Sequence, residues 1–382
     1  MPHRLVYVTV AIDETLRALL TPSPFMVTLA RPLYALERRL TPVIMRALRK
    51  VGLAHFVPEP DERTMLLGQV IWKEARARDI EMHEVRLFNL PRNLFHARKK
   101  DGGTLCFEGM PLPERAYSQV WWLDNKGEMK KRFSKLGIPV ARGGVAFTKR
   151  GAQKLFQSLS APVIVKPYSG SGSRHTTLHI RNEEELMHAF AVAKQVAPLA
   201  VIEEELYGNV YRATVVDGKC VAVLRRDQPR VIGTGVHAIV ELIEKENTHP
   251  ARSGPYFSKI TLNDDALLEL AYRSLTPESV LPEGEVAYLH QKINWSVGGT
   301  TADVTDTVHQ ENMKLFERVA QVLRAPVVGI DFIIPDITRA WQEQERLGVI
   351  ECNSMPFLDN HHLPFEGEPR NVAGAVWDMT LS

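Results

Sequence analysis

Two apolar runs near the C-terminal end constrain the fold of this chain more than any other feature. Residues 327–334 read VVGIDFII and residues 347–352 read LGVIEC, and a helical pattern over 311–323 precedes them. Each run is long enough for one buried strand but far too short for a membrane-spanning helix, which needs about 20 apolar residues. The pattern predicts a layered core of strands and helices, in a fold of the α/β (α+β) class.

Alternating helical and strand patterns extend this prediction back to about residue 121. Asp124-Asn125, Thr148 and Asn182 are expected caps at the starts of three helices. Asp217-Gly218 is typical of the turn in a β-hairpin. The predicted helices cover 124–136, 148–159 and 182–196, and the predicted strands cover 162–167, 200–203, 210–216 and 220–224.

The region before residue 119 divides into two predicted segments. Residues 64–118 read as a small α/β unit, and residues 1–63 read as a basic helical extension. The expected elements are helices over 31–40, 42–53 and 65–78, strands over 80–88 and 104–107, a linker over 58–62 and a turn over 98–103. We interpret the basic side chains of 30–53 as a solvated face or a dimer contact, and the alternative is peripheral contact with an anionic membrane.

The composition excludes several classes of function. The chain has 382 residues, with 47 Lys and Arg against 45 Asp and Glu, which gives a formal charge of +2. This balance argues against nucleic acid as a partner, because neutralising phosphates needs a basic excess. Cys106, Cys220 and Cys352 are widely spaced and odd in number, so we expect a reducing compartment without disulfides or a zinc site. Neither an export signal nor a transmembrane segment is predicted, and the cytoplasm is the expected location.

A lysine followed by a loop of small residues is the first candidate site. Lys166 ends a predicted strand, and it is followed after two residues by Ser169, Gly170, Ser171, Gly172 and Ser173. Glycines let backbone N–H groups approach phosphate oxygens, and the lysine adds positive charge. The order differs from a Walker loop, in which the lysine closes the loop. By itself the pattern fits either a phosphate site or a flexible connection, and the connection is the more common of the two.

Three oxygen-bearing side chains on the two apolar strands form the second candidate site. Asp331 lies in the first strand, and Glu351 and Asn353 lie at the end of the second. Glu351 and Asn353 are two residues apart, so they share one face of the strand. A set of oxygen ligands suits Mg²⁺, which usually shares the phosphates of a substrate. We favour a metal site over a pair of caps because consecutive strands both carry such residues.

The segment over 200–212 is the third candidate site. It is an apolar strand that runs into three acids and then into Gly208. Such a segment fits a hinge between two sheets, with a backbone edge that could pair with a flat heterocycle such as adenine. An ordinary exit from a strand into a loop is the alternative.

Together, and in this order along the chain, the three patterns resemble an ATP-grasp ligase. Asp124-Asn125-Lys126 resembles the start of the family's opening helix, in which a lysine reaches the phosphates. The region from about 120 to 375 is most similar to the ATP-grasp domain of cyanophycin synthetase. The motifs that carry this similarity are NWSVGG at 294–299, DVTDTVH at 303–309, VGID at 328–331 and IECNSMP at 350–356.

The resemblance implies an ATP-grasp fold, in which two α+β subdomains over 119–200 and 201–382 clasp ATP. The small α/β domain and the helical extension would precede them. It also implies a nucleotide site in which Glu203 contacts the adenine amino group and Leu206 lies beside it. The phosphates would be bound by Lys126, Lys166 and a mobile loop over 169–173.

The resemblance further implies a reaction in which ATP phosphorylates a carboxylate and an amine then attacks, releasing ADP and phosphate. Arg212 and Arg226 would lie near the phosphate and the acyl substrate. Two Mg²⁺ ions, with Mn²⁺ as an alternative, would be bound by Asp331, Glu351 and Asn353. The expected partners are a small carboxylate and an amino acid or peptide, and related ligases are often homo-oligomers.

Several positions depart from the family pattern. Val210 and Thr234 replace an acid and an aspartate, and Gly329 stands where D-alanine–D-alanine ligases have an arginine, which makes Arg226 the candidate for stabilising the oxyanion. The pair His361-His362 fits either a substrate contact or packed and capping side chains. Cyanophycin synthetases continue into a Mur-ligase-like domain that this chain lacks, so we do not expect cyanophycin from it alone. A catalytically silent ATP-binding regulator and an ATP-grasp kinase are the alternative functions.

Overall fold

The structure is a computed structural model. It describes residues 40–41, 43–113, 116, 120, 122–123, 126–168, 175–254 and 256–382, and the backbone but not the side chain of Lys126. Three predictions therefore lie wholly or almost wholly outside the described residues: the helix over 31–40, of which only residue 40 is described, the cap at Asp124-Asn125 and the loop from Ser169 to Ser173.

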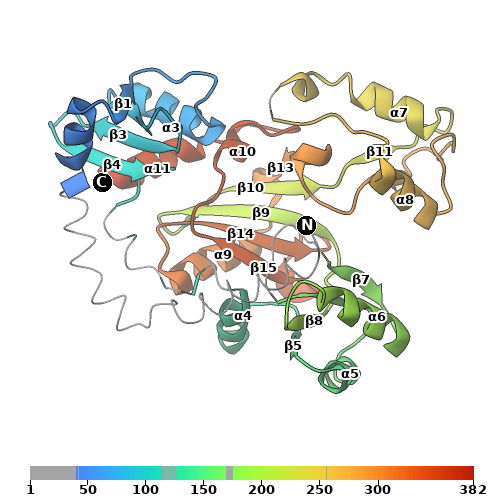
Figure 1. The fold of residues 1–382 in the computed structure, drawn as a ribbon. Helices are drawn as coiled ribbons and strands as arrows, with labels where there is room; N and C mark the ends of the chain where they lie inside the picture. Colours follow the sequence, from blue (N-terminus) through green and yellow to red (C-terminus); the bar gives the residue numbers. More distant parts are fainter. Residues whose placement is uncertain are drawn as a thin grey trace.

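A five-stranded antiparallel sheet forms the centre of the molecule (Figure 1). Its strand order is β13 (Thr300–Asp303), β10 (Lys219–Asp227), β9 (Asn209–Val216), β14 (Val327–Ile334) and β15 (Gly348–Asn353). Both apolar runs that opened the sequence analysis are thus adjacent strands. Asp217 and Gly218 have positive φ values of 50° and 76° and form the predicted turn between β9 and β10.

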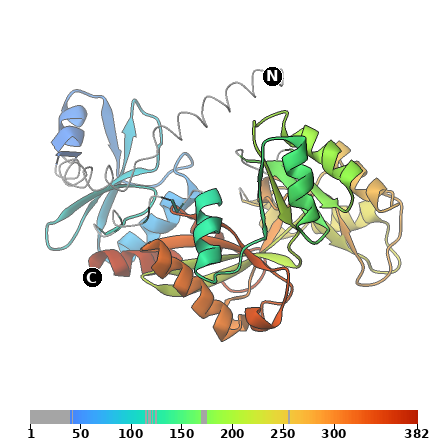
Figure 2. The same ribbon diagram turned by 90° about the horizontal axis from the view of Figure 1, so that it is seen from below.

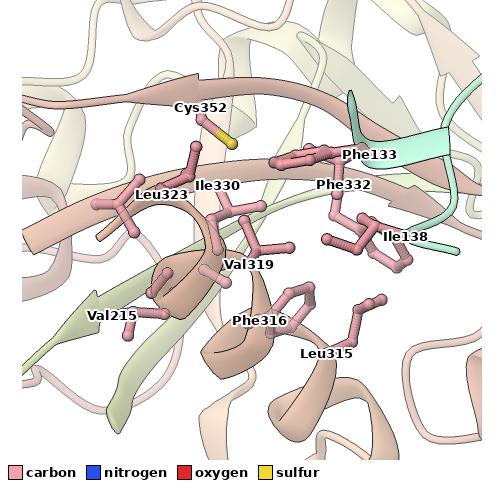
Figure 3. Close-up of a cluster of buried hydrophobic side chains, with 14 of the residues drawn as sticks. Phe133, Ile138, Val215, Leu315, Phe316, Val319, Leu323, Ile330, Phe332 and Cys352 are labelled. Atoms are coloured by element: carbon pink, nitrogen blue, oxygen red, sulfur yellow. The ribbon is translucent and has the colours of Figure 1, made fainter. Parts of the chain in front are cut away.

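Alternation along the strands separates a packed face of this sheet from a polar one. Tyr211, Ala213 and Val215 of β9 point into the main core, which α9 (Gln310–Leu323) and α4 (Lys126–Lys135) close. Figure 3 shows Phe133 of α4 and Phe316 of α9 in this cluster with Phe332 of β14. Since side chains alternate along a strand, Arg212 and Thr214 point to the opposite face.

A second antiparallel sheet lies beside the first one, below it in Figure 1. Its strand order is β5 (Gly143–Ala146), β8 (Ala200–Glu204), β6 (Val163–Pro167) and β7 (Thr177–Ile180), and α5 (Lys149–Gln157) and α6 (Glu183–Ala193) pack on it. The predicted caps Thr148 and Asn182 both accept a hydrogen bond from the backbone of the first helical turn. The strand β8 reaches across the expected subdomain boundary at residue 200.

The N-terminal unit is a four-stranded sheet packed on two helices. The strand order is β1 (Ala54–Val57), β2 (Glu81–Leu87), β3 (Leu94–Arg98) and β4 (Thr104–Glu108). The sequence analysis missed β3, and it placed β1 inside the helical extension. The helix α3 (Leu66–Ala77) matches its prediction.

The last helix of the chain, α11 (Val372–Leu381), completes the core of this N-terminal unit. Trp377 of α11 is fully buried, and its indole N–H donates to the carbonyl of Ile71 in α3 at 2.9 Å. Figures 1 and 2 both show α11 beside α3, at the blue end of the molecule. The two ends of the described chain therefore share one hydrophobic core.

Residues 230–289 form a small unit for which the sequence analysis predicted no helix or strand. The strands β11 (Arg230–Ile232) and β12 (Val286–Tyr288) pair, and α7 (Ile239–Glu246) and α8 (Asp264–Tyr272) pack around their own apolar core. A short helix, α10 (Asp359–His362), follows the central sheet. The 3₁₀ turns are Pro250–Ser253, Trp295–Val297, Thr305–Thr307 and Trp341–Glu343. No helix in the described part of the chain combines the length and apolar character needed to cross a bilayer.

Candidate active site

The first cluster joins the second sheet to α4. Lys166 of β6 donates to Oε2 of Glu203 in the neighbouring strand β8 at 2.8 Å. Lys130 of α4 donates to Oε1 of the same carboxylate. Because Met129 and Phe133 anchor α4 in the central core, Lys130 ties the two sheets together through Glu203. Two ammonium groups thus meet at one buried carboxylate.

Burial and charge act in opposition in this cluster. Burial alone would raise the pKa of Glu203, but Lys166 and Lys130 together lower it. Burial lowers the pKa of Lys130 to about 8, and the nearby Lys166 ammonium adds to this decrease. The cluster therefore carries a net positive charge at neutral pH, which suits an anionic ligand.

Lys130 is the residue of this cluster that the sequence analysis missed. The resemblance pointed to Lys126, whose side chain lies outside the described residues, so its role stays a prediction. A signal was present in the sequence: Lys130 follows the predicted phosphate lysine by four residues, which is the spacing of one helix face. Leu206 is half-buried in the segment that leads from β8 to β9. Its expected place beside adenine is likewise a prediction.

The second cluster lies on the polar face of the central sheet. Arg212 of β9 faces Asp331 of β14, which in turn faces Glu351 of β15. The guanidinium of Arg212 forms two hydrogen bonds with Asp331, of which Nη2–Oδ2 measures 2.9 Å. Arg226 of β10 donates to the same Oδ2 at 3.3 Å. The structure thus brings together four residues that the sequence analysis selected from four separate segments.

Burial sets the electrostatics of the two arginines. Burial alone would lower the pKa of Arg212, but Asp331 and Glu351 raise it. The pKa of Arg226 is lowered, chiefly by burial and also by Arg212, against the attraction of Asp331. Both guanidinium groups stay charged at neutral pH because their reference pKa lies above 12.

Gly329 makes room for the Arg212 side chain. A Cβ atom at this position would lie 2.8 Å from Cβ of Pro356 and 3.3 Å from Cδ and Nη1 of Arg212. Gly329 is two residues before Asp331 on the same strand face, where the D-alanine–D-alanine ligase pattern has an arginine. In this chain Arg212 occupies that space from the neighbouring strand.

The predicted metal ligands supply a hard, oxygen-only donor set. Asn353 pairs with Gly329 between β14 and β15, two residues along each strand from the Asp331–Glu351 pair. Among the described residues no three histidine, cysteine or carboxylate side chains gather around one point, so Asn353 would have to supply the third ligand. Two carboxylates and an amide oxygen are the chemistry that Mg²⁺ prefers, so the residues fit that ion.

The two adjacent histidines have structural contacts. Nε2 of His361 lies 2.7 Å from Oγ1 of Thr214, and His361 is fully buried. Nε2 of His362 accepts from the backbone N–H of Ala373 at 3.0 Å, in the first turn of α11. The reading as packed and capping side chains accounts for both contacts.

Comparison with solved structures identifies the fold. The chain superposes on a bifunctional glutathione synthetase from Pasteurella multocida with a TM-score of 0.65 and 24% sequence identity, over 83% of this chain and 43% of that one. The fold is the ATP-grasp fold. No protein-family model matches the chain.

Sequence comparison finds relatives of this ATP-grasp chain among two groups of enzymes. It is 36% identical over 259 residues to the cyanophycin synthetase of Trichormus variabilis, which covers 67% of this chain and 29% of that protein. It is 27% identical over 321 residues to a glutathione biosynthesis bifunctional protein of Listeria innocua, which covers 82% of this chain and 41% of that protein. The chain spans less than half the length of either relative.

Proposed function

We propose that this chain is an ATP-dependent carboxylate–amine ligase, which forms an amide or peptide bond through an acyl phosphate and releases ADP and phosphate. The observation that carries the proposal is the presence of two clusters in one molecule. The first has two lysines, one on α4 and one on the second sheet, and the second is an Arg–Asp–Glu cluster (Arg212, Arg226, Asp331 and Glu351) on the central sheet. The similarity to cyanophycin synthetases and to a glutathione biosynthesis protein supports the same reaction class.

In this proposal the first cluster binds the nucleotide. Lys130 and Lys166 would contact phosphate oxygens of ATP, and Glu203 holds both ammonium groups in place before the nucleotide arrives. Glu203, with Leu206 beside it, would also contact the adenine. We propose that Lys126 and the loop over 169–173 close on the phosphates from the other side and exclude water from the acyl phosphate.

The second cluster would serve the acyl transfer. Asp331, Glu351 and Asn353 would hold Mg²⁺, in our proposal two ions, with Mn²⁺ as an alternative. When bound, the metal supplies positive charge that offsets the charge of the transferred phosphoryl group. Arg226 would donate hydrogen bonds to the oxyanion that develops when the amine attacks. Arg212, held by two hydrogen bonds to Asp331, fixes that carboxylate and the position of Arg226 beside it.

A screen of substrates tests this function. The protein is incubated with ATP, Mg²⁺ and pooled small carboxylic acids, amino acids and peptides, and products are identified by mass spectrometry. We expect a condensation product together with ADP and phosphate. Formation of AMP would contradict the acyl-phosphate route, and ATP binding without product from any pool would favour a regulatory module.

Two variants connect the activity to the site. Glu351→Gln removes one carboxylate charge from the expected metal set, and turnover should fall at least 100-fold, the scale of losing a buried electrostatic contact of about 3 kcal/mol. Glu244→Gln makes the same chemical change at an exposed position on α7 and should leave turnover unchanged. Equal activity in the two variants would remove Glu351 from the site.

A further inference from the structure

A buried polar group that the proposed reaction does not yet use lies above the polar face of the central sheet. Three consecutive residues of the short helix α10 contribute to it: Asp359, Asn360 and His361, which are 6%, 6% and 0% exposed. Tyr256 is 7% exposed and joins them from the segment after the Pro250–Ser253 turn. We call these four residues the α10 cluster.

Each member of the α10 cluster has a buried polar atom without a well-placed partner. Oδ1 of Asn360 and Nδ1 of His361 are buried and have no hydrogen-bond partner among the described residues. Oδ1 of Asp359 and the hydroxyl of Tyr256 are buried without a partner of good geometry, and the two groups interact only with each other at the edge of hydrogen-bond range. Leaving a buried polar atom unpaired costs roughly 1–3 kcal/mol. Such under-satisfied atoms on neighbouring side chains indicate a place that a ligand completes.

The charge of Asp359 narrows the kind of ligand. The described part of the chain has seven buried Asp and Glu residues: Glu74, Glu84, Glu203, Glu205, Asp227, Asp331 and Asp359. In the other six, a nitrogen of a Lys, Arg or His side chain lies 2.6–2.9 Å from the carboxylate. Asp359 has no such basic neighbour among the described residues, and its pKa is raised to about 6, chiefly by burial. Asp359 is thus the buried carboxylate that a cationic group of a ligand would complete.

The α10 cluster adjoins the Arg–Asp–Glu cluster. His361 is within 2.7 Å of Thr214, which is two residues from Arg212 on the same face of β9. Burial and the Asp359 carboxyl raise the pKa of the Tyr256 hydroxyl, while Arg226 and Arg212 act in the opposite direction. The Tyr256 hydroxyl is thus within electrostatic range of both Asp359 and the two arginines.

Aromatic side chains lie on one side of the α10 cluster. The ring of Tyr256 stacks on Trp295 with centroids 5.4 Å apart, and the edge of Trp295 meets Phe357 at 6.1 Å. A small pocket beside Trp295 is lined by Arg226 and Thr301. Aromatic faces attract cations, so these rings suit the same ligand charge as Asp359.

We propose that the α10 cluster is the subsite that binds the ammonium group of the amine acceptor, with Asp359 as its counter-ion and Asn360 and Tyr256 as hydrogen-bond acceptors. This assignment rests on the proposed ligase function, since it places the nucleophile next to Arg226, the residue proposed to stabilise the oxyanion. It makes Asp359 a determinant of specificity for a primary amine over an alcohol or a thiol.

Kinetics of Asp359→Asn test the proposal. For the amine, kcat/KM should fall about 10- to 100-fold, because a hydrogen bond to a charged group is worth roughly 1.5–3 kcal/mol. The KM for ATP should change less than about twofold. Asp101→Asn, at an exposed turn between β3 and β4, is the matched control and should behave as the wild type. An unchanged kcat/KM for the amine in Asp359→Asn would overturn the proposal.

A stability measurement separates binding from a structural role. Asn at position 359 removes a buried charge without a partner, so the urea midpoint should stay equal or rise. A lowered midpoint together with parallel losses for ATP and amine would show that Asp359 only supports the fold, which also overturns the proposal.

A probe of binding works even if no ligase product is found. n-Butylammonium chloride should raise the midpoint of thermal unfolding above that in sodium chloride of equal ionic strength, and Asp359→Asn should abolish this difference. Absence of the difference in the wild-type protein would refute the ammonium subsite. A wild-type protein that shows the difference yet forms no amide would refute the ligase function and retain the subsite.

Discussion

Gly329, which leaves space for the Arg212 side chain, gives the sharpest test of how the polar face of the central sheet is packed. In Gly329→Ala the new Cβ atom would lie 2.8 Å from Pro356 and 3.3 Å from Arg212, whereas ordinary contacts are 3.4–4 Å. The side chain of Arg212 is held on its other side by Asp331, so it cannot move without weakening that pair. Overpacking of this kind costs about 1–3 kcal/mol. If the Arg212–Asp331 pair also breaks, the loss rises by roughly 3–5 kcal/mol.

Hydrogen exchange can measure this loss locally. Peptides that cover 209–216 and 327–334 report on β9 and β14, and a loss of about 1–3 kcal/mol should speed their exchange roughly 5- to 150-fold. Gly254→Ala is the matched control, because the nearest atom to its new Cβ would be the carbonyl oxygen of Ala251 at an ordinary 3.6 Å. Exchange in both strands within twofold of the wild type would refute the steric account of Gly329.

Three further predictions concern other parts of the molecule. In Glu203→Gln the pKa of Lys130 should fall below its value of about 8, because the carboxylate that raises it is lost. Lys130 then loses its proton at a lower pH, so a pH titration of ATP affinity should show the affinity weakening at lower pH than in the wild type. The pKa of His361 is lowered to about 3 by burial, so the unfolded chain binds more protons between pH 6.5 and about 3. The free energy of unfolding should fall by about 1.4 kcal/mol per pH unit on acidification through that window, and chemical denaturation of His361→Asn should show a shallower slope. Trp377→Ala should destabilise the N-terminal unit by about 3–5 kcal/mol, measured as faster exchange in α3.

Local chemistry made much of the fold predictable. The caps Thr148 and Asn182 and the turn at Asp217-Gly218 act within a few residues, so the sequence carries their whole signal. The strands β14 and β15 are continuous apolar runs, and this signal is also contained within a few residues of sequence.

The missed features depend on contacts between distant residues. The strand β3 reads LFHAR, five residues whose pattern does not distinguish a strand from a loop, and only its pairing with β2 and β4 defines it. The contact of Lys130 with Glu203 depends on the orientation of α4, which is set by the burial of Met129 and Phe133. The α10 cluster is recognised by the burial of its polar side chains, and the spacing of residues in the sequence does not predict that burial.

The packing of α11 on α3 has a consequence for the order of folding during synthesis. The four-stranded N-terminal sheet is translated by residue 108, but the helix that completes its core ends at residue 381. At about 5–20 residues per second, roughly 15 to 50 s separate the two events. During that interval Trp72 and Phe107 lack the ring of Trp377, so the hydrophobic core of the N-terminal unit stays incomplete. A nascent chain of this protein should therefore expose an apolar surface that chaperones can bind until α11 has been synthesised.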